Sequence, residues 1–216
     1  MTSQNNSHII LTQMNKNAFI VFEGGEGCGK TTQAKALSNK LRKLGFPVVL
    51  THEPGGTLLG NRLRRWLKWG RGVTIQTELY LFLASRSQLL YKVIRPALEK
   101  NYIVICDRFD PSSFAYQGYG RGMDLDFINI VNSFVTDGLS PGLIVLLDIS
   151  VEEGLARKKM QLDVFEREEF LFHQRVRDGY LKMAAADPER WMVVDATLPE
   201  VKIREIIWER VSQLLG

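Results

Sequence analysis

Residues 24–31 read G-x-x-x-x-G-K-T, with Gly24, Gly29, Lys30 and Thr31 at the defining positions. An apolar run at residues 18–22 precedes this pattern, and apolar residues at helical spacing follow it. A strand, a glycine-rich turn and a helix in this order form a loop whose backbone N–H groups surround phosphate oxygens. An incidental glycine-rich turn would not need both flanking elements. The sequence therefore predicts a P-loop, in which Lys30 reaches the β- and γ-phosphates of a nucleotide and Thr31 binds Mg2+.

Five short apolar runs predict buried strands, because none of them alternates with polar residues as a half-exposed strand does. They are residues 19–22, 47–51, 102–106, 143–148 and 191–194. Helical patterns separate them at residues 30–44, 58–67, 78–100 and 124–135, and a last one starts near residue 199. Asp124 is the expected N-cap of its helix. The alternation predicts an α/β fold, a five-stranded parallel sheet with helices on both faces.

The composition favours one soluble domain at residues 16–216, preceded by a polar, flexible tail at residues 1–15. The net charge of +4 suits anionic substrates and is too small to indicate nucleic-acid binding. We expect no signal peptide, membrane span or membrane partner. Cys28 and Cys106 are far apart and form no metal or redox motif, which indicates a reducing compartment. A cytoplasmic protein is therefore expected.

Candidate site residues follow the strands, because ligands of such sheets bind at the carboxyl ends of the strands. Glu53 and Pro54 lie in T-H-E-P-G-G-T after the second apolar run, although a tight turn alone would explain this segment. Asp107 and Arg108 end the third run. In a P-loop protein such an acid is the usual second magnesium contact, and an arginine beside it can bind phosphate with two hydrogen bonds.

Further candidates lie in segments between the predicted strands. Phe82 and Arg86 are four residues apart, so a ring could stack on a base while a guanidinium binds its edge. Core packing, with the arginine reaching solvent, explains the pair equally well. Residues 110–122 combine hydroxyl, amide and aromatic groups with glycines, and residues 157–159 are basic. The basic segment could close over a transferring phosphoryl group, but by charge alone a solvated helix face is the better interpretation.

Taken together, these segments resemble the thymidylate kinase family over residues 19–215. The matching segments are residues 22–33, 53–57, Phe82 with Arg86, 107–108, 115–118 with 120–122, and 195–197. The resemblance implies a P-loop nucleoside-monophosphate-kinase fold with a lid near residues 154–168. It also implies phosphoryl transfer from ATP to dTMP with Mg2+, in dTTP synthesis, by a homodimer.

The resemblance also implies roles for individual residues. Contacts to ATP are implied for Gly24, Gly25, Glu26, Gly27, Cys28, Gly29, Lys30, Thr31, Thr32, Asp195, Ala196 and Thr197. Contacts to the acceptor nucleotide are implied for Glu53, Pro54, Arg64, Phe82, Arg86, Arg108, Ser112, Ser113, Tyr116 and Gln117. Magnesium contacts are implied for Thr31 and Asp107, and catalytic roles for Lys30, Arg108, Glu26, Arg157, Lys158 and Lys159. In this scheme Phe82 stacks on thymine, Arg86 bonds the base edge, and Tyr116 crowds a ribose 2′-hydroxyl.

Two departures from the family pattern affect these roles. His52 stands where the family often has arginine, and Val164 stands where the lid often has arginine. The loop at residues 25–28 contains no basic residue, so the resemblance is to the lid-dependent class typical of bacteria. The lid function then depends on Arg157, Lys158 or Lys159, without a choice among them.

Three rival functions remain at this stage. One is a kinase for another nucleotide, such as another pyrimidine nucleotide, or for a deoxynucleoside. The second is a GTP-dependent switch, which usually carries Asn-Lys-x-Asp, but neither Asn-Lys pair of this sequence has Asp two residues further on. The third is an ATP-driven nucleic-acid binder, which would need a stronger basic stripe and stacking platforms.

Overall fold

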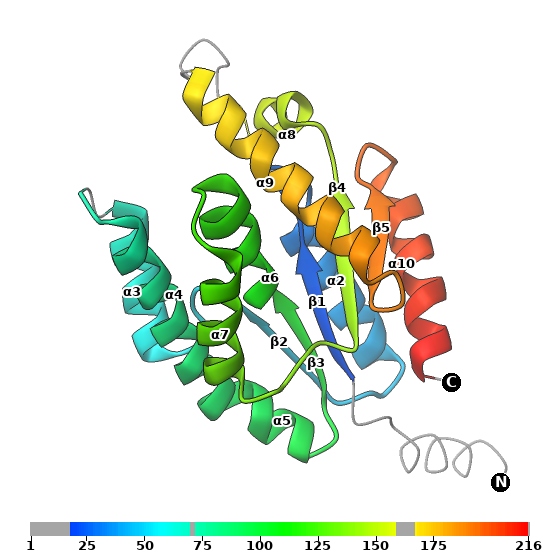
Figure 1. Ribbon diagram of the computed structural model, residues 1–216. Helices are drawn as coiled ribbons and strands as arrows, with labels where there is room; N and C mark the ends of the chain where they lie inside the picture. The colour runs from blue at the N-terminus through cyan, green and yellow to red at the C-terminus, as the bar shows by residue number, and fades with distance from the viewer. Residues whose placement is uncertain (1–17, 70–71, 159–166, 216) are drawn as a thin grey trace, which may run out of the picture.

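The computed structural model describes residues 18–69, 72–158 and 167–215, and its centre is a five-stranded parallel sheet (Figure 1). The strands stand in the order β2-β3-β1-β4-β5. They are β1 (Phe19–Glu23), β2 (Val48–His52), β3 (Ile103–Asp107), β4 (Leu143–Asp148) and β5 (Trp191–Asp195). The predicted fold class is confirmed. Most strands end one residue later than expected, because the polar residue after the apolar run still pairs, as His52 does with Asp107.

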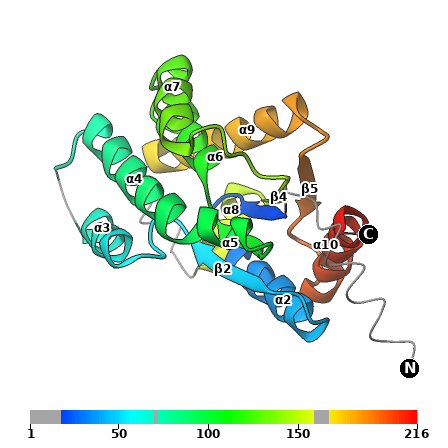
Figure 2. The ribbon, with the colours of Figure 1, turned by 90° about the horizontal axis from the view of Figure 1, so that it is seen from below.

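Two helices cover one face of the sheet, α2 (Lys30–Lys43) and α10 (Glu200–Leu215). They lie side by side below the strands in Figure 2. Their apolar residues, including Leu37, Leu41 and Ile207, form one core cluster with β-strand residues such as Ile20 and Val145. Burial of this apolar surface on both sides of the sheet is the main stabilisation of the fold.

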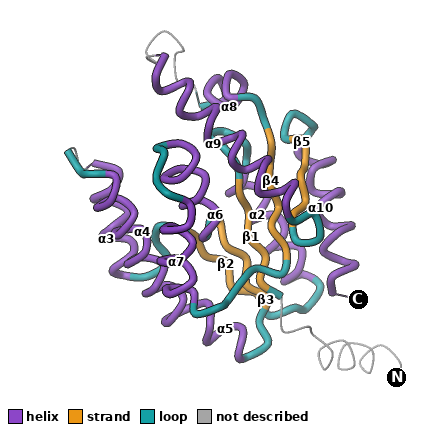
Figure 3. The backbone as a smooth tube through the Cα atoms, viewed as in Figure 1, coloured by secondary structure: helices purple, strands orange, loops and turns teal. Residues whose placement is uncertain are grey.

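The opposite face is covered by more elements, which carry most of the predicted acceptor-site residues (Figure 3). They are α4 (Ile75–Leu89), the π-helical turn η1 (Leu90–Ile94), α5 (Arg95–Glu99), α6 (Asp110–Ser113), the π-helical segment η2 (Phe114–Gly120), α7 (Leu125–Thr136) and α9 (Arg167–Ala186). Outside these layers lie α3 (Leu58–Trp69), packed on α4, and α8 (Val151–Arg157), beside α9. The predicted N-cap is confirmed, since Asp124 Oδ1 accepts from the N–H of Phe127 at 2.7 Å.

Helix α9 was not predicted, although the sequence contained an indication of it. Phe172, Val176, Tyr180 and Ala184 recur every four residues, and all four contribute to the core cluster between α9, η2 and β4. Within the described part of the chain, no helix is long and apolar enough to cross a bilayer. The predicted tail, Lys159 and Val164 lie outside the described residues. The division into a tail and one domain therefore stays a prediction.

Candidate active site

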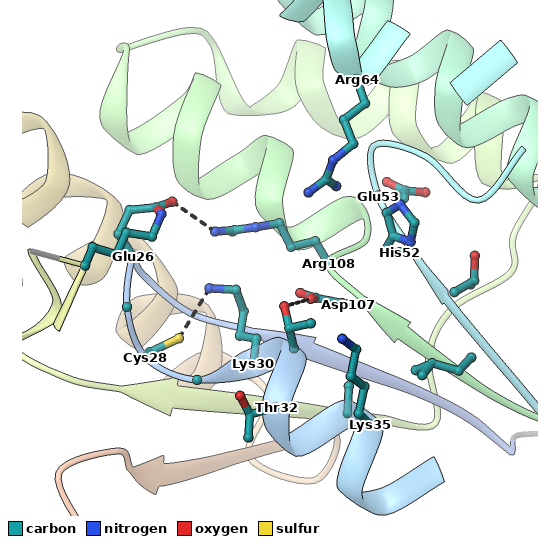
Figure 4. Close-up of a pocket in the computed structure, with 17 residues that line it drawn as sticks. Glu26, Cys28, Lys30, Thr32, Lys35, His52, Glu53, Arg64, Asp107 and Arg108 are labelled. Carbon is teal, nitrogen blue, oxygen red and sulfur yellow. Dashed lines mark hydrogen bonds and ion pairs between the residues drawn. The ribbon is translucent and has the colours of Figure 1, made fainter. Parts of the chain in front are cut away.

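A cavity of about 790 Å³ lies at the carboxyl ends of β1, β2 and β3, where the sequence placed the site. Most of the loop residues line it, together with Thr31, Thr32, His52, Arg64 and Asp107. Figure 4 shows Arg64 extending toward it from α3 and Arg108 from the end of β3. Lys35, one turn into α2, also lines the cavity and was missed by the motif analysis. The cavity is thus lined by charged side chains from five segments, which are the loop with α2, the ends of β2, β3 and α8, and helix α3.

The loop has the strained backbone that its glycines permit. Gly24 has φ +140° and Gly29, the N-cap of α2, has φ +92°, both in a region that disfavours other residues. No side chain caps α2, so the N–H groups of its first turn remain available to a ligand. Lys30 Nζ donates to the carbonyls of Gly24 at 2.9 Å and Gly25 at 2.6 Å, and to Cys28 Sγ at 3.3 Å. Burial and the charge of Arg108 lower the pKa of Lys30.

Thr31 and Asp107 bring two oxygen ligands together at the cavity. Thr31 Oγ1 donates a hydrogen bond to Asp107 Oδ2, across from α2 to the end of β3. A hydroxyl and a carboxylate are hard ligands of the type that Mg2+ prefers, and this ion commonly takes only one or two groups from the protein. No cluster of three or more His, Cys, Asp or Glu side chains suited to a metal occurs among the described residues. The pair therefore fits Mg2+ better than a metal that needs an all-protein cage.

Arg108 is held by side chains from four elements. Its Nη1 donates to Ser112 Oγ at 3.3 Å and Tyr180 Oη at 3.2 Å, and its Nη2 donates to Tyr116 Oη at 2.9 Å and Glu26 Oε1 at 3.3 Å. Its own backbone has φ +74°, in the left-handed region. A non-glycine residue in this conformation is uncommon and is maintained only where the surroundings fix it. The guanidinium is therefore preorganised beside the loop.

Beneath Arg108 lies a buried carboxylate that the sequence analysis missed. Glu23 is fully buried and accepts from Phe109 N at 2.8 Å, Ser112 Oγ at 2.7 Å and Tyr180 Oη at 2.7 Å. Burial raises the pKa of Glu23, and the nearby charge of Arg108 opposes this only in part. The position of Glu23, directly before the glycine-rich loop, was a usable indication. Tyr180 lies on helix α9, so the sequence analysis could have included it only if that helix had been predicted.

The short helix α8 joins the basic segment to the phosphate loop. Gly27 and Gly154 approach so closely that a Cβ on either would overlap with backbone of the other segment. Lys158 Nζ forms an ion pair with Glu26 Oε2. Burial alone would raise the pKa of Glu26, but Arg108 and Lys158 outweigh it and lower this pKa to about 2. Arg157, in contrast, donates to the carbonyl of Ala196 at 2.8 Å.

A second cavity of about 310 Å³ adjoins the first. Every predicted acceptor-site residue except Arg86 lines it, so Phe82, Ser113, Tyr116 and Gln117 surround the same space. Leu67 of α3 adds an apolar wall that was not predicted. Glu26, Glu53, Arg64 and Arg108 line both cavities. The two spaces therefore meet at these four side chains.

Arg86 lies behind the wall of the second cavity and is only 1% exposed. Nε and Nη2 both lie 2.8 Å from Glu53 Oε2, and Nη2 also donates to the carbonyl of Phe109 at 3.0 Å. Nη1 donates to Ser113 Oγ at 3.0 Å and to Asn132 Oδ1 at 2.5 Å. Four of the five N–H groups of the guanidinium thus form hydrogen bonds within the protein, and Nη2 also takes part in the ion pair with Glu53. Arg86 thus neither reaches solvent nor lines the cavity, and it holds Glu53 and Ser113, which do.

Residues 195–197 form a turn after β5 and line neither of these two cavities. Thr197 donates through N and Oγ1 to Asp195 Oδ1, at 2.8 and 2.7 Å. The turn adjoins the site through Arg157, which bonds to Ala196. A contact of this turn with a nucleotide base therefore stays a prediction.

Comparisons with known proteins agree on one family. The family model described as "Thymidylate kinase" matches residues 22–207. A thymidylate kinase of Dehalococcoides mccartyi strain CBDB1 is 52% identical over 201 residues, covering 92% of this chain and 97% of the relative. One from Deinococcus radiodurans is 46% identical over 204 residues, covering 93% and 98%. The crystal structure of a thymidylate kinase from Ehrlichia chaffeensis superposes with a TM-score of 0.74 at 35% identity, covering 89% of this chain and 97% of that one.

Proposed function

This chain belongs to the thymidylate kinase family, and from this membership we propose that its larger cavity binds ATP and its smaller cavity binds dTMP. The enzyme is an ATP-dependent phosphotransferase that converts dTMP to dTDP in dTTP synthesis. One observation above all supports the division of the site. The two cavities share Glu26, Glu53, Arg64 and Arg108, so a donor phosphate and an acceptor phosphate would meet at these side chains.

On the donor side, the phosphate loop and the first turn of α2 supply N–H groups to the phosphates of ATP. Lys30 exchanges its bonds to the carbonyls of Gly24 and Gly25 for bonds to phosphate oxygens. Thr31 and Asp107 would hold Mg2+, as the donor set suits it. When bound, this ion neutralises charge on the phosphates.

On the acceptor side, Arg108 binds the phosphate of dTMP and aligns it with the γ-phosphoryl group. Positioning and charge neutralisation are the main protein contributions to phosphoryl transfer. Phe82 stacks on the base, and Tyr116 leaves no room for a 2′-hydroxyl. Lys158, with Arg157 and Lys159, neutralises the charge of the moving phosphoryl group from the lid side.

We further propose a cytoplasmic homodimer. Helix α7 carries Phe127, Ile130 and Phe134 exposed to solvent, and Phe134 is 86% exposed. Exposed apolar residues in such a row are typical of a protein interface. The two cysteines, Cys28 and Cys106, are buried free thiols, which suits a reducing compartment.

A coupled assay of ADP release tests the substrate assignment. We expect the highest kcat/KM with dTMP among dTMP, dUMP, dCMP, AMP and thymidine, with Mg2+ required. A preference for another pyrimidine nucleotide would favour the alternative function. A preference for thymidine would contradict the role of Arg108 as a phosphate ligand. Omission of Mg2+ and addition of EDTA provide the metal control.

A further inference from the structure

We infer that Glu78 is a specificity-determining positioning residue, which orients the side-chain amide of Gln117 so that the base pocket favours an imide edge, as in thymine or uracil, over cytosine. The inference rests on the proposed function, because it takes the smaller cavity as the nucleobase pocket. It adds a residue that lines neither of the two cavities of the site and that acts through another residue.

The contact between the two side chains is short and partly buried. Gln117 lies on η2, is 2% exposed and lines the smaller cavity. Its Nε2 donates to Glu78 Oε1 at 2.6 Å. Glu78 lies in the first turn of α4, whose position is fixed by the N-cap Thr74. The bond therefore connects two helical segments 39 residues apart in the chain.

The carboxylate of Glu78 determines the orientation of the side-chain amide of Gln117. A carboxylate only accepts hydrogen bonds, whereas an amide has one accepting and one donating end. Gln117 must therefore direct its NH2 group to Glu78 and its Oε1 away from it. Among the described residues, Oε1 accepts no hydrogen bond, and it is not one of the buried atoms left without a partner. An acceptor is thus kept available at the cavity, and one N–H of Nε2 remains beside it.

This pair of groups matches the imide edge of a pyrimidine. Thymine and uracil present N3–H between two carbonyl oxygens, so N3–H can donate to Oε1 while an oxygen accepts from Nε2. Cytosine has an acceptor at N3, which would face the acceptor Oε1. A buried polar group that meets the wrong partner loses its hydrogen bond and is costly, and this is how binding sites reject close analogues. The contact does not involve the methyl group of thymine, so it does not distinguish thymine from uracil.

The neighbouring residues of α4 support the same assignment. Glu78, Phe82 and Arg86 are spaced by four, so they lie along one face of the helix. Phe82 lines the cavity, and Arg86 holds Glu53 and Ser113 in its wall. Arg86 forms four hydrogen bonds within the protein and does not line the cavity, so as placed here it acts on the pocket through Glu53 and Ser113. One face of α4 thus serves the pocket at three successive turns.

Glu78→Gln tests the inference with an isosteric change. Gln at this position both donates and accepts, so it no longer dictates the orientation of Gln117. We expect the ratio of kcat/KM for dTMP over dCMP to fall about tenfold, the equivalent of roughly one hydrogen bond to a charged group. Most of the change should appear as a higher KM for dTMP, and dUMP should follow dTMP. Glu205→Gln, on the exposed side of α10, is the matched control and should leave the ratio unchanged.

A double-mutant cycle with Gln117→Ala shows whether Glu78 acts through the amide. In the Gln117→Ala background, Glu78→Gln should change the ratio by less than about twofold. An unchanged ratio in Glu78→Gln, an equal loss for all nucleotides, or additive effects of the two substitutions would each overturn the inference. Failure of the proposed function would appear separately, as a preference of the unsubstituted enzyme for a nucleotide other than dTMP.

Discussion

Arg108 shows how one residue can be fixed by its surroundings before substrate arrives. Its backbone N–H donates to the carbonyl of Phe22 at 3.0 Å, and its side chain bonds to Ser112, Tyr116 and Tyr180. These contacts stabilise a left-handed backbone that would be unfavourable in isolation. A guanidinium held in this way loses little further entropy when it binds a phosphate, which makes it suitable for alignment as well as for binding.

Arg108→Ala should therefore affect both binding and turnover. We expect a higher KM for dTMP and a lower kcat, with kcat/KM reduced about 100-fold or more, because charge-assisted hydrogen bonds to phosphate are lost. Steady-state kinetics at saturating ATP measure this. Arg95→Ala is the control, because Arg95 forms only a surface ion pair with Asp137 at 3.0 Å and bonds to nearby carbonyls. Unchanged dTMP kinetics in Arg108→Ala would refute its assignment.

Among the individual site residues, the sequence indicated those that directly follow a strand or belong to a motif. It missed residues whose place in the site depends on hydrogen bonds to distant parts of the chain. Arg108, Glu53 and Gln117 were found from their places after apolar runs or in a polar segment. Glu23 and Tyr180 were missed, because the bond between them joins residues 157 positions apart. Arg86 was noticed, but neither of its two interpretations included a buried guanidinium with four hydrogen bonds inside the protein. No local pattern specifies such a network.

The element that most affects the proposed mechanism is α8 with the residues that follow it. The side chains of two adjacent basic residues at its end contact different segments. Lys158 meets Glu26 in the phosphate loop, whereas Arg157 bonds to Ala196 in the turn after β5. The close approach of Gly27 and Gly154 keeps α8 against the loop. Lys158 is therefore the better placed of the two described residues to act on the transferring group.

Lid substitutions should separate these roles. Neutralising Arg157, Lys158 and Lys159 together should lower kcat far more than ATP affinity, by about 100-fold or more, because the charges act mainly in the transition state. Lys158→Gln alone should account for more of the loss than Arg157→Gln. Single-turnover rates and the Kd of ATP measure the two quantities. Lys202→Gln on the exposed face of α10 is a control, and equal losses in rate and affinity would indicate simple anchoring.

Among the helices and strands, those whose apolar residues follow one clear pattern could be predicted from the sequence. The five strands and helices α2, α3, α7 and α10 follow from apolar runs or helical spacing. The segment at residues 78–100 was expected as one or two helices and contains α4, a π-helical turn and α5. Such a turn depends on backbone hydrogen bonding near Pro96, which lacks an N–H, and not on side-chain pattern. η2 likewise followed from no pattern, although it carries Tyr116 and Gln117.

On the scale of the whole molecule, α7 is a helix whose apolar residues one chain does not fully cover. Ile128 packs with Leu79 and Leu83 of α4, so one side of α7 belongs to the core. Phe127, Ile130 and Phe134 lie on the other side, and Ile130 is 65% exposed. A large ring such as Phe134 buries substantial apolar area when a partner covers it. In a symmetric dimer the same residue would be buried in both chains.

Phe134→Asp should convert the proposed homodimer to a monomer. In a two-fold interface each substitution introduces two carboxylates into apolar surroundings, which is strongly unfavourable. Light scattering after gel filtration, at several protein concentrations, measures the mass, and circular dichroism verifies that the variant is folded. Val201→Asp is a matched control, since Val201 is a 63% exposed apolar residue on α10, on the other face of the sheet. A monomeric unsubstituted protein would contradict the dimer, and a dimeric Phe134→Asp would exclude α7 from its interface.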